Sequence, residues 1–298
     1  MVLFMQIGSE AHRALFCQSF LDSYLDYEPE QLPWPNLDAV TLDRLRQIHF
    51  WEEALDTERK AGVMVSAYAR TISDPHVRAA VELQAQEETR HARLLKFMVQ
   101  HYGIETKLRP EPVLPEAIEL AFTDFGYEEC LDSFFGFGLF GIARESGFFP
   151  ESLLNLFDPL LDEEARHIVF FVNWMAYQQV NQGQTIKLFR DAKALWHYSR
   201  ALKRLMTAFG GAQGTGAGFT ASSANSVVMG LKPAQFVATC LRENDDRMSK
   251  FDQQLIRPQL MPILSRLALN LFQGWFSGRQ QPHNIIDKLT ITRQDCEV

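Results

Sequence analysis

The segments EETRH at residues 87–91 and EEARH at residues 163–167 decide the fold of this chain. They are 76 positions apart, and a second pair of similar segments, WEEALDT at 51–57 and YEECLDS at 127–133, is separated by the same distance. A single Glu-x-x-His pattern occurs by chance in a chain of this composition, whereas two copies of the longer pattern in register do not. The sequence therefore contains two related helical hairpins.

Helical periodicity dominates from about residue 42 to residue 181 and predicts four long helices. Asp74 and Pro75 form an N-cap and first-turn signal, and Pro150 marks another break. The expected fold class is all-α, an antiparallel four-helix bundle. Its expected helices span residues 42–72, 75–102, 116–147 and 151–181.

The rest of the chain is expected to pack on this bundle, which gives three regions: an N-terminal arm at 1–41, the bundle at 42–182 and a helical C-terminal extension at 183–298. In the arm, we expect an amphipathic helix over residues 11–27, followed by an extended proline-rich stretch.

In the extension, the glycine- and serine-rich segment from Gly210 to Ser226 interrupts the helical pattern and is expected to form a mobile loop. The stretch from Leu260 to Phe276 is amphipathic. It is a candidate contact for a homodimer or a membrane surface, with ordinary packing as the alternative.

Each copy of the repeated motif can present two metal ligands on one helix face. Residues three apart lie on the same side of a helix, which pairs Glu88 with His91 and Glu164 with His167. Apolar residues at helical spacing flank both pairs, so we expect both to face the interior. Buried carboxylates without partners are costly, and divalent cations would offset their charge. The pattern predicts a metal site.

Two metals in a helical bundle need one further carboxylate from each of the other two helices. In the first helix, Glu58 lies on an apolar stripe and at the same height as Glu88. In the third helix, Glu129 and Asp132 both remain candidates. Glu145 is rejected, because it lies roughly 13 Å along the helix axis from the height of the second motif.

This order of ligands, a Glu, then Glu-x-x-His, then a carboxylate, then a second Glu-x-x-His, resembles the ferritin-like di-iron carboxylate superfamily. The resemblance covers about 140 of the 298 residues. It implies two iron ions, with manganese or a mixed manganese and iron pair as alternatives. It also implies that Glu88 and Glu164 bridge or chelate the metals and that His91 and His167 are terminal ligands. The outer carboxylates would be Glu58 and either Glu129 or Asp132.

The superfamily includes ferritins, rubrerythrins, ribonucleotide reductase small subunits, aldehyde-deformylating oxygenases and arylamine N-oxygenases. This chain lacks rubredoxin-type cysteine pairs, and Leu160 replaces the additional histidine of the N-oxygenases. We find no tyrosine at a position suited to radical storage. The subfamily is therefore open.

The function that we expect is an oxidoreductase that activates dioxygen to oxidise a small organic substrate, with electrons from an unknown donor. Two alternatives remain: a ferroxidase or peroxide-scavenging iron-binding protein, and a helical scaffold with a vestigial metal site. The long extension after Gly183 favours the oxidoreductase over a minimal ferritin, because it can roof a substrate pocket.

Composition narrows the partners and the location. The net charge of -8 and the pI near 5.5 disfavour nucleic-acid binding. The sequence has no export signal and no apolar run long enough to span a bilayer, so a cytoplasmic location is expected. No two cysteines form a CxxC pair, which predicts free thiols: Cys17, Cys130, Cys240 and Cys296.

Several other residues receive structural interpretations. Arg90 and Arg166 are expected to pair with Glu87 and Glu163, either at the surface or beside the metal ligands. The Phe-Gly run at 134–141 is interpreted as core, with an apolar channel as the alternative. Six further histidines are expected at the surface or at helix caps: His12, His49, His76, His101, His197 and His283.

Overall fold

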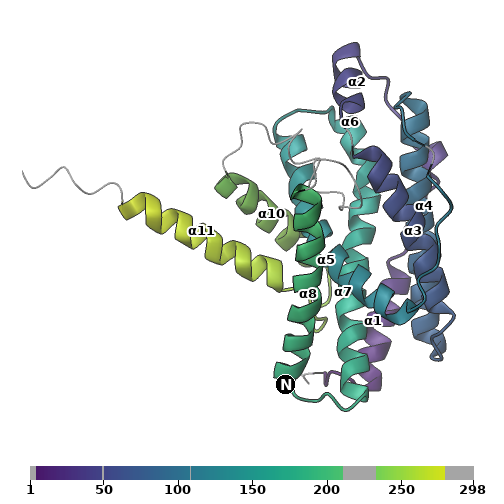
Figure 1. Cartoon of the computed structure of the whole chain (residues 1–298), viewed down its shortest axis with the longest axis vertical. Coiled ribbons are helices and arrows are strands. Elements are labelled where there is room, and N and C mark those ends of the chain that lie inside the picture. The colour runs from purple at the N-terminus through teal and green to yellow at the C-terminus, as the bar shows by residue number, and fades with distance from the viewer. Residues whose placement is uncertain (1–4, 49, 108, 211–232, 279–298) are drawn as a thin grey trace, which may run out of the picture.

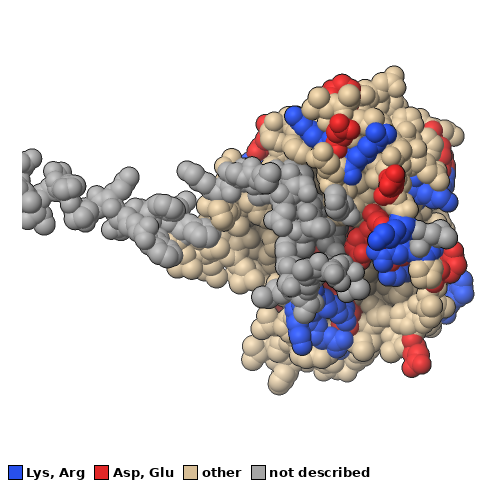
Figure 2. All heavy atoms as spheres, turned by 45° about the horizontal axis from the view of Figure 1, so that its top comes forward, with Lys and Arg blue, Asp and Glu red and all other residues tan. Residues whose placement is uncertain are grey.

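The computed structural model describes residues 5–48, 50–107, 109–210 and 233–278, and within these ranges the chain is helical and contains no strand. This confirms the all-α fold class. No helix in the same ranges is both long enough and apolar enough to cross a membrane. On the face in Figure 2, acidic and basic side chains lie interspersed. Three cysteines are buried free thiols: Cys17, Cys130 and Cys240.

Four long helices surround the candidate site. They are α3 (Trp51–Ala69), α4 (Pro75–His101), α5 (Ile118–Glu145) and α7 (Asp158–Asn181). Helix α3 packs against α4 and α5, and α7 packs against the same two helices, so the four enclose a common interior (Figure 1). Asp74 caps α4 as predicted, because its side chain accepts hydrogen bonds from the backbone of His76 and Val77.

The predicted helix at 42–72 is wrong in one respect, because the chain forms two helices there. Helix α2 (Ala39–Arg46) ends before α3 begins at Trp51. The indole Nε1 of Trp51 donates to the carbonyl oxygen of Leu45 at 2.9 Å across the break. Ile48 and Phe50 are buried between the two helices. Burial of these apolar side chains favours a turn here over a continuous helix.

The predicted helix at 151–181 is also interrupted. A short helix α6 (Glu151–Leu154) is followed by a 3-10 turn (Asn155–Phe157), and only then does α7 begin. Pro159 lies in the first turn of α7. Proline has no backbone N–H and is tolerated only at the start of a helix, so a new helix begins just before it.

The N-terminal arm packs on two of the four long helices. Helix α1 (Glu10–Asp22) contacts α4 and α7. It ends five residues before the predicted limit at residue 27. The proline-rich stretch that follows is not wholly extended, since Pro29–Gln31 form a 3-10 turn that packs on α4.

Three helices of the C-terminal region are described. Helices α8 (Lys187–Gly210) and α10 (Pro233–Met248) pack against α5, and α11 (Leu260–Gly278) packs against α10 and projects away from the other helices (Figure 1). The predicted mobile loop lies outside the described residues, apart from Gly210, which ends α8.

Glycines in α5 allow close packing on two sides. A Cβ atom at Gly126 would collide with the ring of Phe171 on α7. At Gly138 it would collide with the Sγ atom of Cys240 on α10 and lie 3.0 Å from the Cα atom of that residue. Phe134 and Phe137 are buried. The Phe-Gly run therefore packs in the core, as interpreted, and Gly136 and Phe137 also line a cavity, as in the alternative.

Candidate metal centre

Carboxylates and imidazoles from the four long helices converge on one buried cluster. The described residues form two sets of four whose ligand atoms lie within 4.8 Å of one another: Glu58, Glu88, His91 and Glu164; and Glu88, Glu129, Glu164 and His167. The two sets share Glu88 and Glu164. Each adds one histidine and one carboxylate of its own. This is the arrangement that two adjacent metal ions with two shared carboxylates require.

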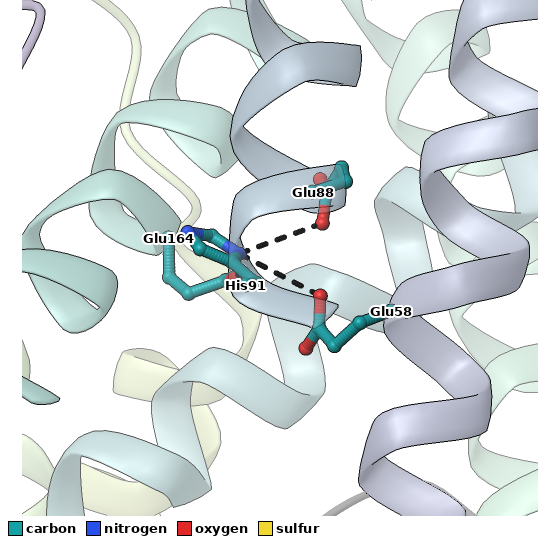
Figure 3. Close-up of side chains that lie close together, drawn as sticks. All are labelled: Glu58, Glu88, His91 and Glu164. Carbon is teal, nitrogen blue, oxygen red and sulfur yellow. Dashed lines mark ion pairs between the residues drawn. The ribbon is translucent and has the colours of Figure 1, made fainter. Parts of the chain in front are cut away.

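Figure 3 shows the first set. Glu58 reaches in from α3, and Glu88 and His91 lie one turn apart on α4. The Nδ1 atom of His91 is 3.2 Å from Glu164 Oε1, 3.5 Å from Glu58 Oε2 and 3.7 Å from Glu88 Oε2. None of these contacts is a directed hydrogen bond, so this buried nitrogen has no hydrogen-bond partner among the described residues.

The second set repeats this geometry around His167. Its Nδ1 atom is 3.1 Å from Glu88 Oε1 and 3.9 Å from Glu129 Oε1, again without a directed hydrogen bond. The Oε2 atom of Glu129 is also buried and has no hydrogen-bond partner in the described chain. Buried polar atoms are nearly always satisfied, so these atoms fit ligands of an ion that would lie between them.

Burial and mutual charge shift the acid–base properties of the cluster. Burial raises the pKa of Glu58 to about 8. Burial, followed by repulsion from Glu88 and Glu164, holds the pKa of Glu129 well above its usual range. For His167, burial opposes protonation, but the carboxylates of Glu88 and Glu87 outweigh it and raise the pKa to about 10. In the metal-free cluster, protons therefore supply the compensating positive charge.

The far side of each histidine is held by a carboxylate from the opposite motif. The Nε2 atom of His91 on α4 donates to Glu163 Oε2 on α7 at 2.9 Å. The Nε2 atom of His167 on α7 donates to Glu87 Oε2 on α4, also at 2.9 Å. A carboxylate can only accept, so each ring carries a proton on Nε2. In the neutral ring that binds a metal ion, the Nδ1 lone pair would then face the cluster.

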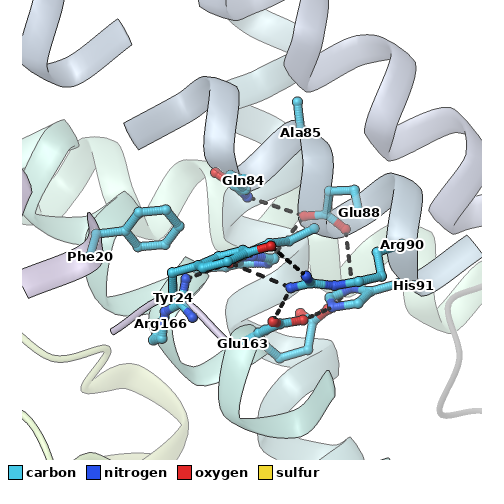
Figure 4. Close-up of polar contacts among 12 residues, drawn as sticks. Phe20, Tyr24, Gln84, Ala85, Glu88, Arg90, His91, Glu163 and Arg166 are labelled. Atoms are coloured by element: carbon cyan, nitrogen blue, oxygen red, sulfur yellow. Dashed lines mark hydrogen bonds and ion pairs between the residues drawn. The ribbon is translucent and has the colours of Figure 1, made fainter. Parts of the chain in front are cut away.

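The two arginines of the repeat complete these crossed pairs, and Figure 4 shows Glu163 between Arg90 and His91. Arg90 pairs with Glu163, and Arg166 donates to Glu87 Oε1 at 2.6 Å. Both guanidinium groups are buried. The two arginines are therefore partners of Glu87 and Glu163 beside the cluster, as expected, and the main partner of each lies on the other helix. The spacing of three within one helix leaves Arg90 and Glu87 3.9 Å apart.

The N-terminal arm covers this layer. The guanidinium of Arg90 lies 4.3 Å from the ring centre of Tyr27, and that of Arg166 lies 4.8 Å from the ring centre of Phe20. The hydroxyl of Tyr27 donates to Glu163 Oε2 at 3.1 Å. No local sequence pattern indicates this contact, because Tyr27 and Glu163 are 136 positions apart.

The structure separates the candidates of the third helix. Glu129 of α5 belongs to the cluster, whereas Asp132 is in neither set and lines the cavity beside it. Glu145 lies apart from the cluster and forms an ion pair with Arg242 at 2.5 Å. The height argument that set Glu145 aside agrees with this placement.

Two further histidines are buried, which corrects their expected place at the surface or at caps. His12 of α1 lies 3.0 Å from Asn173 Oδ1 on α7 and accepts a hydrogen bond from the backbone of Gly8. His197 of α8 lies 2.9 Å from Asp124 Oδ1 on α5. Both anchor peripheral helices rather than the cluster.

Comparisons with known proteins give no match: no family model, no curated protein and no solved structure is similar to this chain. The geometry of the cluster therefore carries the functional argument.

Proposed function

We propose that the four long helices form a ferritin-like bundle and that their buried cluster holds two metal ions, which we take to be iron. The observation that carries this proposal is the sharing of Glu88 and Glu164 between two sets of four ligands. A site for one ion would leave the second histidine and the remaining carboxylates without a role.

Charge balance supports two divalent ions. The negative charge of the four glutamates in the cluster equals the positive charge of two divalent cations. The two histidines bind a metal as neutral ligands and leave this balance unchanged. Mixed carboxylate and imidazole ligands suit iron and manganese, so manganese or a mixed pair remains the alternative. The ligand sets include Glu129, which disfavours a vestigial site with no ligand from the third helix.

We further propose that the protein is an oxidoreductase that uses dioxygen to oxidise a small organic molecule. Two bound irons would supply the redox chemistry for dioxygen. The protein orients the ligands and excludes water from them. Glu163 and Glu87 fix the orientation of the two histidine rings, and the N-terminal arm covers the outer side of these rings. A cavity with largely apolar walls reaches the cluster, which supports a substrate beyond iron itself.

Metal analysis tests the proposal. We expect close to two iron ions per chain in protein loaded with ferrous iron, and less than one in the double variant Glu88→Ala/Glu164→Ala. Wild-type protein with two metals per chain that consumes neither dioxygen nor peroxide would overturn the redox function. Oxidation of ferrous iron to a mineral core, with many irons per chain, would instead establish the ferroxidase alternative.

A further inference from the structure

Two cavities lie in line beside the cluster. The outer one, of about 340 Å³, opens between α3, α5 and α8, and the inner one, of about 100 Å³, reaches the metal-site carboxylates. Both are lined by the same five residues: Thr57, Ala61, Phe125, Glu128 and Asp132. Because they share this much wall, they form one passage, with the shared residues as its neck.

The inner cavity joins an apolar wall to the cluster. Its apolar lining includes Phe137 of α5 and Leu160 and Leu161 of α7. The rest of its lining contains the four carboxylates of the cluster: Glu58, Glu88, Glu129 and Glu164. The unpartnered Oε2 atom of Glu129 belongs to this part of the lining, and the side chain is 9% exposed. A molecule that enters this cavity would lie against hydrocarbon on one side and the metals on the other.

Four charged residues that line the outer cavity have partners of opposite sign: Glu53, Lys60, Glu128 and Arg204. Arg204 pairs with Glu128, and Lys60 pairs with Asp56 at 2.6 Å. Glu53 is 3.4 Å from Arg109. A charged ligand would have to compete with these ion pairs and would lose its hydration on entering the neck. A neutral ligand meets neither cost.

We propose that this passage is the substrate site and that it takes a neutral, mainly apolar molecule with one hydrogen-bonding group. The apolar part enters the inner cavity, and the polar group remains at the neck near the hydroxyl of Thr57. The outer cavity falls within the usual range for small ligands, about 300–1,000 Å³. This inference rests on the proposed function for its reaction, but the binding site itself can be tested without turnover.

The test compares three six-carbon probes, 1-hexanol, hexylammonium and hexanoate, by titration calorimetry on metal-loaded and metal-free protein. We expect 1-hexanol to bind wild type at least about tenfold more tightly than either ion. Tighter binding of hexylammonium or hexanoate would overturn the inference that the passage takes neutral molecules. Binding of 1-hexanol to metal-free protein separates this result from the proposed function, which is tested by metal content and by consumption of dioxygen or peroxide.

Matched variants on α3 locate the site. Ala61→Leu fills the neck and should weaken binding of 1-hexanol at least about tenfold. Ala67→Leu makes the same change beside a separate hollow between α3 and α4 and should leave binding unchanged. Thr57→Val keeps the shape of the neck and removes its hydroxyl, so it gives a second reading if Ala61→Leu does not fold. Wild-type affinity in both neck variants would overturn the assignment.

Discussion

Glu163 lies 2.9 Å from His91 Nε2, although it is four residues before His167 on its own helix. The reciprocal contact joins Glu87 to His167. Each half of the internal repeat thus orients the histidine of the other half.

We expect Glu163→Gln to lower metal affinity by about 10–100-fold at the position that contains His91, and less at the other. The amide keeps the size of the side chain but removes the charge that favours Nε2 as the donor. Competition with a metal-binding dye measures the two affinities. Glu82→Gln, at an exposed position of the same helix as His91, is the control and should match wild type. Equal losses at both positions would contradict the crossed assignment.

The third helix gives a second prediction. Glu129→Ala should remove about one metal ion per chain, because it deletes a ligand of only one set. Asp132→Ala and Glu145→Ala should retain both metals. Helical circular dichroism should stay close to wild type in all three variants, since apolar packing supplies most helix stability. Metal loss in Asp132→Ala but not in Glu129→Ala would show that the wrong carboxylate has been assigned.

His12 predicts a pH dependence of stability. Burial lowers the pKa of His12 below 6.5, although its contact with Asn173 acts in the opposite direction. A lowered pKa means that the folded state favours the neutral ring of His12. The contribution of this ring to stability is therefore fully present above pH 6.5 and is lost as the pH falls from there toward the pKa of the folded state. The loss is at most about 1.4 kcal/mol per pH unit.

Urea unfolding at pH 7.5 and pH 5.5 checks this prediction in metal-free protein. The free energy of unfolding should fall more between the two pH values in wild type than in His12→Gln, which cannot titrate. An equal fall in both proteins would show that His12 makes no contribution.

Close packing of α10 on α5 gives a fourth prediction. Gly138→Ala should destabilise the fold by about 1–3 kcal/mol, because the new methyl group collides with Cys240. In a Cys240→Ala background the cost should be smaller, since the Sγ atom is gone and only the close approaches to the Cα and Cβ atoms of that residue remain. Urea unfolding of wild type, the two single variants and the double variant gives this double-mutant cycle. Additive changes in the free energy of unfolding would contradict direct packing of the two residues.

The repeat made much of the site predictable. Spacing within one helix places Glu88 beside His91, and the shift between copies places Glu164 beside His167. Spacing does not tell which residues face each other across two helices, so the pairing of Arg90 with Glu163 could not be foreseen. The choice between Glu129 and Asp132 likewise depended on the rotation of α5.

One break in the predicted helices and one buried histidine depend on contacts that helical periodicity does not show. The hydrogen bond from Trp51 to Leu45 stabilises a turn that the local periodicity does not reveal. His12 finds its partner Asn173 161 positions away, and no local pattern indicates that such a histidine will be buried. Local propensity is a weak guide wherever tertiary packing decides.

The crossed contacts also constrain how the molecule opens. Buried polar contacts from Glu87 and Glu163 join α4 to α7, so neither helix can separate without exposing unpaired charge on both. The two hairpins of the repeat thus behave as one cooperative unit toward local unfolding. In hydrogen exchange, amides at the centres of α4 and α7 would lose protection together, at the free energy of global unfolding.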